Sequence, residues 1–223
     1  MEATETFKNI VNNRRSVRAF LPEPVSESTL HSVFATAQRA PSNCNTQPWE
    51  VAVASGNAIE RLRKLIPEAF AAGQWTMDFP YDGKYEGVYK ERQHGAAAEL
   101  YGAMGIGRED KALRQAQFMK NFEFFDAPHV AFLFLPEPFG IREAADLGMY
   151  AQNLMLSMTA HGLASCPQTA LSFMADLVRR ELGIGEHNKL LFGISFGYED
   201  TNNSANKCWT DRAAVTEAVS FHS

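Results

Sequence analysis

An uninterrupted apolar run near the middle of the chain limits the folds that this sequence can adopt. The run extends from His129 to Leu135, is rich in β-branched and aromatic side chains, and lies between Pro128 and Pro136. A short run of this kind with such boundaries predicts a strand buried in the core. A membrane-spanning helix needs about 20 apolar residues, far more than this run contains. We therefore expect a globular domain that contains a sheet.

Weaker patterns on both sides of this run predict further elements. Apolar residues at helical spacing predict helices over residues 26–38, 59–66, 143–160 and 176–182. Two more short apolar runs predict strands over residues 49–54 and 190–196. We expect the second helix to end at Pro67, and we interpret residues 162–170 as a loop fixed by a proline. This alternation is typical of a layered α+β or α/β domain.

Residues 67–125 differ from the rest of the chain. They hold 11 of the 25 aromatic residues in about a quarter of the length, and they contain no clear strand. We expect residues 75–83 to form a loop and Lys111–Phe125 to be helical. Long loops inserted in compact domains are often lids or binding loops.

Composition excludes several classes of function. A net charge of −5 argues against sequence-independent binding to nucleic acid, which requires a basic face. The three cysteines are an odd number without a C-x-x-C pair, so neither a disulfide framework nor a cysteine zinc site is encoded. The start of the chain, Met1–Glu5, is acidic, unlike the basic start of a secretion signal. We expect a soluble cytoplasmic protein.

The common catalytic and nucleotide-binding motifs are absent. The sequence has no G-x-x-x-x-G-K-[ST], no G-x-G-x-x-G, no H-E-x-x-H and no G-x-S-x-G. The six histidines show no spacing typical of metal ligands. Metalloprotease and serine-hydrolase functions are therefore not indicated.

Three polar segments remain as candidate binding elements. Arg14, Arg15 and Arg18, together with Ser16, can converge on one dianion, or they can form a solvated basic face. The amides between Pro41 and Pro48 suit a heterocycle with alternating donors and acceptors, or they are ordinary turn formers. Residues 162–170 can present backbone N–H groups to a ligand, or they only connect two elements.

The order and spacing of five segments resemble the FMN-dependent nitroreductase superfamily, of the type that uses NAD(P)H and nitroaromatic compounds. The segments are R-R-S-V-R-A-F at 14–20, P-S-N-C-N-T-Q-P-W at 41–49, D-L-G-M-Y-A-Q-N-L-M-L at 146–156, G-L-A-S-C-P-Q at 162–168 and F-G-I-S-F-G-Y at 192–198. The resemblance covers about residues 7–66 and 126–217. It implies an α+β fold with a central, mostly antiparallel sheet flanked by helices. It also implies an intertwined homodimer with FMN at the interface, in which residues 1–223 form one domain and 67–125 an inserted lid.

The resemblance also assigns roles to cationic residues. Arg14, Ser16 and Arg212 are expected to hold the FMN phosphate, while Arg15 and Arg18 reach the ribityl chain or the pyrimidine edge. Lys207 is a further candidate, because Cys208 stands where the family commonly has a basic residue.

Two loops are expected to contact the flavin ring. The first, in part from the partner subunit, contributes Pro41, Ser42, Asn43, Asn45 and Gln47. The second presents its backbone toward N5 and O4 and consists of Pro167, Gln168, Thr169 and Ala170. FMN N5 transfers the hydride in this scheme, so no catalytic side chain is expected. We interpret Cys44 and Cys166 as packing residues and Asp146 as structural.

The implied activity is a ping-pong exchange in which NADH or NADPH reduces FMN and a nitroaromatic acceptor then takes two electrons, giving nitroso and hydroxylamine products. Aromatic residues of the insert are candidates to stack on the acceptor: Trp75, Phe79, Tyr81, Phe122, Phe124 and Phe125. Two alternatives remain open. The same cofactor can serve quinones, enones or halogenated phenols, or the chain can bind flavin without turnover.

Overall fold

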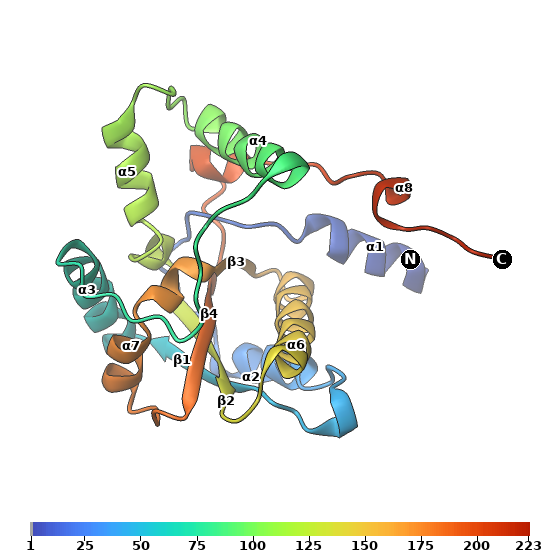
Figure 1. The fold of residues 1–223 in the computed structure, drawn as a ribbon, viewed down its shortest axis with the longest axis horizontal. Helices are drawn as coiled ribbons and strands as arrows, with labels where there is room; N and C mark the ends of the chain where they lie inside the picture. Colours follow the sequence, from blue (N-terminus) through green and yellow to red (C-terminus); the bar gives the residue numbers. More distant parts are fainter. Residues whose placement is uncertain (1) are drawn as a thin grey trace.

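The computed structural model describes residues 2–223, so Met1 of the acidic start lies outside the described residues (Figure 1). The strands are β1 (Glu50–Ser55), β2 (His129–Pro136), β3 (Ala164–Gln168) and β4 (Asn188–Gly197). The α-helices are α1 (Ala3–Asn13), α2 (Glu27–Ala37), α3 (Asn57–Ala71), α4 (Gly87–Ala103), α5 (Lys111–Met119), α6 (Ile141–Ala160), α7 (Ala175–Leu182) and α8 (Val215–Ala218). Short 3-10 helices are η1 (Asn43–Asn45), η2 (Phe124–Asp126), η3 (Thr169–Phe173) and η4 (Ser204–Lys207). None of the helices within residues 2–223 has the length and apolar character needed to cross a membrane.

The four strands form one antiparallel sheet in the order β1-β2-β4-β3. Helices α3 and α7 lie on one face of this sheet and α2 and α6 on the other (Figure 1). The predicted α+β class and its antiparallel sheet are therefore confirmed. The strands predicted over 49–54 and 190–196 correspond to β1 and β4.

Strand β2 is apolar throughout because both of its faces are covered. Val130, Phe132 and Phe134 belong to the core cluster shared with α3 and α7. The alternate residues of the strand, Ala131 to Leu135, belong to the cluster shared with α2 and α6. Side chains of a strand point alternately to its two faces, so a strand covered on both faces has no polar positions. The buried strand predicted from the sequence is confirmed.

The expected end of the second helix at Pro67 is wrong. Helix α3 continues through this proline to Ala71. A proline inside a helix removes one backbone hydrogen bond, at a cost of about 3 kcal/mol relative to alanine. Ile66 before it and Ala69 after it are both buried against the sheet. We attribute the continuation of the helix to this packing, which offsets the missing bond.

The segment 162–170, expected to be a loop, contains strand β3. Residues Ala164–Gln168 pair antiparallel with β4 at the edge of the four-stranded sheet. Pro167 lies in this strand opposite Ile194. Proline is tolerated in edge strands, which explains why its presence did not prevent strand formation.

The insert is more helical than the sequence indicates. Helix α4 was not predicted, and the helix expected over Lys111–Phe125 ends at Met119. Phe124, Phe125 and Asp126 follow with positive φ angles of 60°, 53° and 65°. Helix α4 has no buried residue, so it lacks the apolar stripe that reveals a helix in a sequence. The expected loop over 75–83 has no helix or strand.

Candidate functional site

The arginine segment is extended and lies along the edge of the sheet. Ser16 forms a parallel bridge with Ser165 of β3, and the N–H of Val17 donates to the carbonyl of Ser165 at 3.0 Å. Further on, Phe20 forms an antiparallel bridge with Glu199 just after β4. These contacts fix the backbone from which the arginine side chains project.

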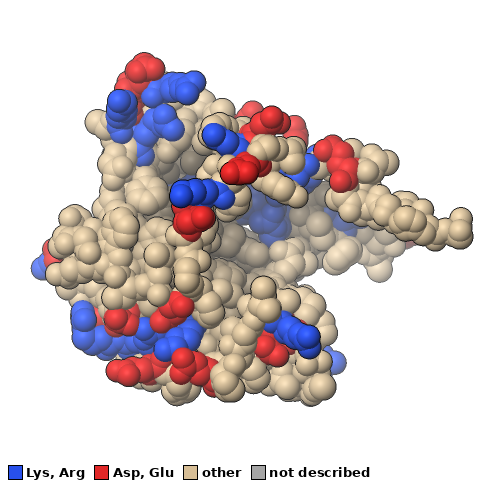
Figure 2. Space-filling view, viewed as in Figure 1, with Lys and Arg blue, Asp and Glu red and all other residues tan. Residues whose placement is uncertain are grey.

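A cavity of about 660 Å³ opens beside this segment. Its walls come from the end of α1, the arginine segment, α4, α6 and the C-terminal segment, and its lining residues are Val11, Asn12, Arg14, Arg15, Ser16, Arg18, Ala96, Gln152, Cys208, Trp209, Thr210, Asp211 and Arg212. Figure 2 shows basic side chains gathered in the hollow between the body and the arm that carries the C-terminus. The structure thus brings together five of the six residues proposed for the phosphate, ribityl and pyrimidine contacts.

Lys207, the sixth of these residues, lies apart from the cavity. It is exposed on η4 and does not line the cavity, whereas its neighbour Cys208 is buried and does. Sequence reasoning missed the other eight lining residues, which are Val11, Asn12, Ala96, Gln152, Cys208, Trp209, Thr210 and Asp211. Gln152 lies inside the segment D-L-G-M-Y-A-Q-N-L-M-L at 146–156, and Trp209 lies between Lys207 and Arg212. Proximity to these features was the signal that could have identified both residues. Nothing in the sequence marks Ala96.

The cavity favours an anion. Partial burial, and next the nearby positive charge of Arg212, lower the pKa of Arg14 from its ordinary value. Within residues 2–223, no carboxylate forms an ion pair with Arg14, Arg18 or Arg212. Guanidinium groups without a paired carboxylate bind phosphate oxygens strongly, and Arg14 and Arg18 are also half-buried. The alternative of a basic face paired with local acids applies only to Arg15.

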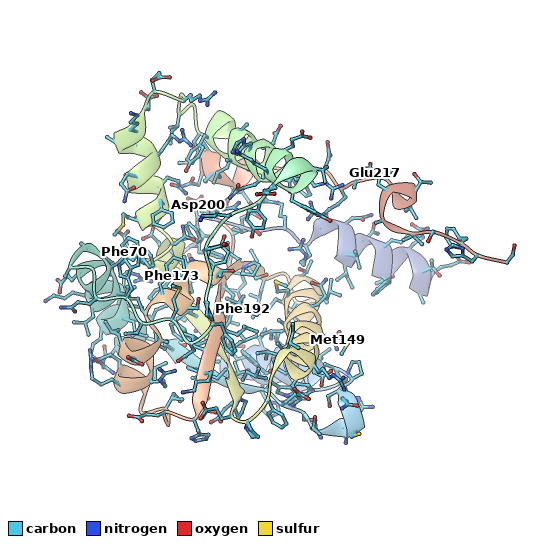
Figure 3. All side chains as sticks on the ribbon, in the orientation of Figure 1. Phe70, Met149, Phe173, Phe192, Asp200 and Glu217 are labelled. Carbon is cyan, nitrogen blue, oxygen red and sulfur yellow. The ribbon has the colours of Figure 1, made fainter. Side chains whose placement is uncertain are left out.

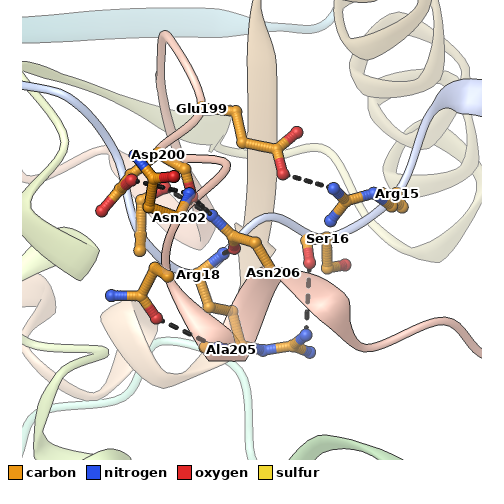
Figure 4. Close-up of polar contacts among 10 residues, drawn as sticks. Arg15, Ser16, Arg18, Glu199, Asp200, Asn202, Ala205 and Asn206 are labelled. Atoms are coloured by element: carbon orange, nitrogen blue, oxygen red, sulfur yellow. Dashed lines mark hydrogen bonds and ion pairs between the residues drawn. The ribbon is translucent and has the colours of Figure 1, made fainter. Parts of the chain in front are cut away.

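Arg15 is held between two other residues. Its Nη2 donates to Glu199 in an ion pair (Figure 4), and its guanidinium carbon lies 4.9 Å from the centre of the Trp209 ring. Its Nη1 is buried without a hydrogen-bond partner among the described residues. Glu199 therefore neutralises Arg15, and the excess positive charge of the cavity comes from the other three arginines, which outnumber the carboxylate of Asp211.

The loop from Pro41 to Gln47 lies away from this cavity and has a strained backbone. Cys44, Asn45 and Gln47 have φ angles of 50°, 55° and 50°, which are unusual for residues other than glycine. Several hydrogen bonds hold the loop; among them, Asn43 N–H donates to Asp146 Oδ2 at 3.0 Å, and Gln47 N–H donates to Ser42 Oγ at 2.9 Å. Asp146 is buried on α6, consistent with the structural role expected for it.

Pro41, Ser42, Asn43, Asn45 and Gln47 are exposed or half-buried, and none of them lines the cavity of the same chain. Strained backbone conformations persist where the surroundings impose them, and they cluster at ligand sites. The loop is thus presented on the surface, at a distance from the arginine cavity.

The segment that follows Cys166 mixes one buried side chain with exposed ones. Gln168 is buried; its Nε2 donates to the carbonyl of Asn121 at 2.8 Å, and its Oε1 accepts from Ser195 Oγ. Pro167 and Thr169 are exposed, and Ala170 is half-buried. The Gln168 amide is therefore committed to internal hydrogen bonds.

The aromatic candidates separate into an exposed set and a buried set. Trp75 stacks on Phe70 with ring centres 5.1 Å apart and lies 6.4 Å from Phe173, which in turn lies 6.2 Å from Tyr81. Phe70 and Phe173 are labelled in Figure 3. Trp75 and Tyr81 are 55% and 43% exposed. Phe79 is half-buried and packs against the α2–α6 side of the core.

The other three aromatic candidates are core residues. Phe122, Phe124 and Phe125 are between 0% and 2% exposed and pack in the cluster below α3 and α7. Their side chains therefore stabilise the fold at the base of the insert in this structure, which corrects the expectation that they face an acceptor. The sequence did not distinguish them because apolar rings look alike in a core and in a binding site.

The three thiols are free and differ in environment. Cys166 is buried, and this burial raises the pKa of its thiol to about 11, which disfavours the reactive thiolate. Cys208 is also buried, whereas Cys44 is exposed in the strained loop. This environment agrees with the packing role expected for Cys166.

Comparison with known proteins decides the family. The model of the Nitroreductase family matches residues 11–198, which include the arginine segment and all four strands. The chain belongs to the nitroreductase family. The resemblance inferred from the five sequence motifs is therefore confirmed.

Two curated relatives and one solved structure illustrate the similarity. The chain is 47% identical to nitroreductase NfnB of Mycolicibacterium smegmatis, over 99% of this chain and 94% of the relative. It is 33% identical to a 4-nitrobenzoate reductase of Nocardioides sp., over 99% of this chain and 92% of the relative. The crystal structure of the FMN-dependent nitroreductase NfnB from Mycobacterium smegmatis in complex with NADPH superimposes with a TM-score of 0.95 and covers 100% of both chains at 47% identity.

Proposed function

We propose that this nitroreductase-family member is an FMN-dependent oxidoreductase that uses NAD(P)H to reduce nitroaromatic compounds. The observation that carries the proposal is the arginine cavity, in a chain similar over its whole length to an FMN-dependent nitroreductase crystallised with NADPH. That relative makes NADPH the first nicotinamide to test. The expected cytoplasmic location agrees with three free cysteines.

The residues present fit FMN. A volume of about 660 Å³ lies within the range of about 300–1,000 Å³ that is usual for small-molecule sites. Three unmatched guanidinium groups suit a phosphate dianion, and Arg15 Nη1 is a buried donor without a partner. We assign the phosphate to Arg14, Ser16 and Arg212, and the ribityl or pyrimidine edge to Arg15 and Arg18. Lys207 is exposed nearby and serves as the control position.

When bound, FMN supplies hydride acceptance and hydride delivery at its N5 atom. This chain's own residues bind and orient it. A positive group near N1 and O2 favours the reduced anionic flavin, which is the chemical value of an arginine beside the pyrimidine. The backbone of Pro167, Gln168, Thr169 and Ala170 is proposed to face N5 and O4, and the committed Gln168 amide holds that backbone in place. No side-chain nucleophile takes part.

The proposed functional unit is a homodimer. Phe7 on α1 and Phe221 near the C-terminus are 61% and 87% exposed, and every residue from Trp209 to Ser223 is exposed. Helix α1 and the C-terminal arm extend from the body, and α6 presents Met149 toward the same open side (Figures 1 and 3). Apolar side chains on an extended arm favour a covering partner. In this dimer the strained loop of one chain, Pro41–Gln47, reaches the flavin of the other.

The proposed acceptor wall consists of the exposed aromatic residues Trp75 and Tyr81; Phe79 packs against the other side of the core. Rings in an offset stack leave flat faces on which a nitroarene can stack. Phe122, Phe124 and Phe125 are not part of this wall, because they are buried.

A reconstitution experiment tests the function. Purified protein incubated with FMN and desalted is expected to remain yellow, to bleach anaerobically with NADPH or NADH, and to regain its colour when a nitroarene is added. Protein that retains no flavin contradicts the whole proposal. Flavin that is retained but not bleached by either nicotinamide supports a non-catalytic flavin protein instead.

Two variants test the phosphate assignment. Replacement of the cavity arginine, R212Q, removes charge-assisted hydrogen bonds worth about 1.5–3 kcal/mol, which corresponds to an affinity for FMN lower by about 10- to 100-fold. The matched variant K207Q removes a nearby charge outside the cavity and is expected to leave FMN affinity unchanged. Titration of apo-protein by flavin fluorescence measures both, and equal losses would refute the assignment.

A further inference from the structure

The buried amide of Asn206 connects the two cationic walls of the cavity. Asn206 lies in η4, is 3% exposed and does not itself line the cavity. Its Nδ2 donates to the carbonyl of Ala19 at 2.8 Å and to that of Asp200 at 2.9 Å. Its Oδ1 accepts from the N–H of Arg18 at 2.7 Å (Figure 4). Both amide hydrogens and the amide oxygen are therefore used.

These hydrogen bonds cross between segments that lie far apart in sequence. Arg18 and Ala19 belong to the arginine segment, which carries Arg14, Ser16 and Arg18 into the cavity. Asn206 stands just before the C-terminal segment Cys208–Arg212, which forms the opposite wall. Ala19 O also accepts from the N–H of Asp200 at 3.1 Å, so the amide reinforces a backbone contact at the same point. The amide thus ties one wall to the other.

The hydrogen bonds of Asn206 act against an electrostatic repulsion between the two walls. The positive charge of Arg212 lowers the pKa of Arg14, after the larger effect of burial, which means that the two cations repel each other across the cavity. A phosphate needs both cations at hydrogen-bonding distance, and a misplacement of about 1 Å is enough to lose most of the benefit of a positioned group. A neutral side chain that holds the backbones together opposes this repulsion without competing for the anion.

We infer that Asn206 is a positioning residue for the phosphate end of the cavity, because it fixes the spacing between the Arg14–Arg18 segment and the Cys208–Arg212 segment. The inference rests on the proposed function, since the anion in question is the phosphate of FMN. It concerns a residue that does not line the cavity. Its effect should fall mainly on the phosphate, because the bridges at Ser16 and Phe20 also hold the backbone that carries Arg18.

The experiment compares FMN with riboflavin, which has the same ring and ribityl chain but no phosphate. Apo-protein of the full chain is titrated with each flavin, and the change in flavin fluorescence gives the two dissociation constants. The variant N206A is expected to weaken FMN binding by about tenfold, equivalent to about 1.4 kcal/mol, and to leave riboflavin binding nearly unchanged. If N206A yields no folded apo-protein, N206S provides the same comparison with a small polar side chain in the buried position.

A matched control comes from the same turn. Asn203 Oδ1 accepts from the N–H of Ala205 at 3.0 Å and caps η4, so its side-chain hydrogen bond stays within the turn. The variant N203A is expected to preserve the ratio of FMN to riboflavin affinity. Circular dichroism and thermal unfolding of each apo-protein verify folding.

The outcomes separate this inference from the proposed function. Equal weakening of both flavins by N206A shows a general structural role and overturns the inference, as does unchanged FMN binding. Wild-type protein that binds neither flavin contradicts the proposed function itself. A selective loss of FMN affinity in N206A, absent in N203A, supports the positioning role.

Discussion

Strand β2 and helix α4 differ in how many of their side chains are buried. All but the last residue of β2 is buried, and its side chains alternate between two core clusters. Helix α4 has no buried residue and lies beside η4 at the cavity rather than on the sheet (Figure 1). Burial of apolar area is the main stabilising term in folding. Burial in the sheet therefore stabilises the fold, whereas helix α4 adds little to the core.

The largest effect should come from the sheet. The variant F132A removes a fully buried ring from β2 and is expected to lower the free energy of unfolding by about 3–5 kcal/mol. Its counterpart in the insert, L113A on α5, truncates a side chain that is 54% exposed and should change stability by less than about 0.5 kcal/mol. Urea unfolding of both variants measures the contrast. Similar losses would break the comparison.

The next effect concerns the point where the insert is anchored. Arg179 of α7 is buried and pairs with Asp78 at 2.5 Å and with Asp176, whose side chain is 62% exposed. Burial by itself lowers the pKa of Arg179, but hydrogen bonds and charges from both carboxylates outweigh it, so the pKa is raised. The variant D78N leaves a buried charge without its buried partner and should cost about 3 kcal/mol.

The exposed partner of the same arginine is the control. The variant D176N should cost less than about 1 kcal/mol, because solvent screens this pair. Thermal and urea unfolding measure both variants. If D176N were as damaging as D78N, burial would not explain the anchoring of the insert.

A smaller effect of opposite sign is expected at Pro67, where α3 enters the insert. Replacement by alanine restores a helix-forming residue, at a gain of up to about 3 kcal/mol, but it also removes part of a half-buried ring. We expect P67A to raise the free energy of unfolding by about 1 kcal/mol, measured by urea unfolding. A loss of stability would show that packing of the proline ring contributes more to the free energy of unfolding than the helix propensity of alanine restores.

The smallest effect concerns His129, at the first position of β2. Its Nε2 accepts from the N–H of Val25 at 2.9 Å, and its Nδ1 lies 2.5 Å from Ser55 Oγ, so the folded state holds a neutral ring. Burial lowers the pKa of His129. A lowered pKa means that the unfolded chain binds the proton first, so this contribution to stability is complete above the ordinary histidine pKa and is lost as pH falls below it.

The variant H129Q should therefore lose less stability than wild type between pH 7 and pH 5. His94 is exposed on α4, so H94Q is the matched variant from the insert and should keep the wild-type pH dependence. Urea unfolding at both pH values measures the difference. If the free energy of unfolding of H129Q changed with pH as in wild type, His129 would not be the source of this pH dependence.

Much of the fold followed from local patterns. The run of residues 129–135 predicted β2 because a strand covered on both faces must be apolar at every position. Helix α6 was predicted over nearly its whole length, because apolar residues recur around most of its circumference. Helix α4 was missed for the opposite reason, since a helix without a buried stripe has no period to detect.

The candidate site was predicted unevenly. The arginine segment was recognised because several guanidinium groups stand close together in sequence. Trp209 and Asn206 were not recognised, because each meets its partner across most of the chain and has no local signal. Phe122, Phe124 and Phe125 were assigned to an acceptor site because composition does not distinguish a core ring from a binding ring.

The sequence by itself determined the family, the buried strand at the centre of the sheet and the presence of a cationic segment near the N-terminus, because each depends on residues close together in the chain. Only the tertiary structure decided that Lys207 lies outside the cavity and that Arg15 is neutralised by Glu199. It also decided that α3 continues through Pro67. The physical reason is that burial and charge pairing depend on distances in space, which the order of residues does not specify.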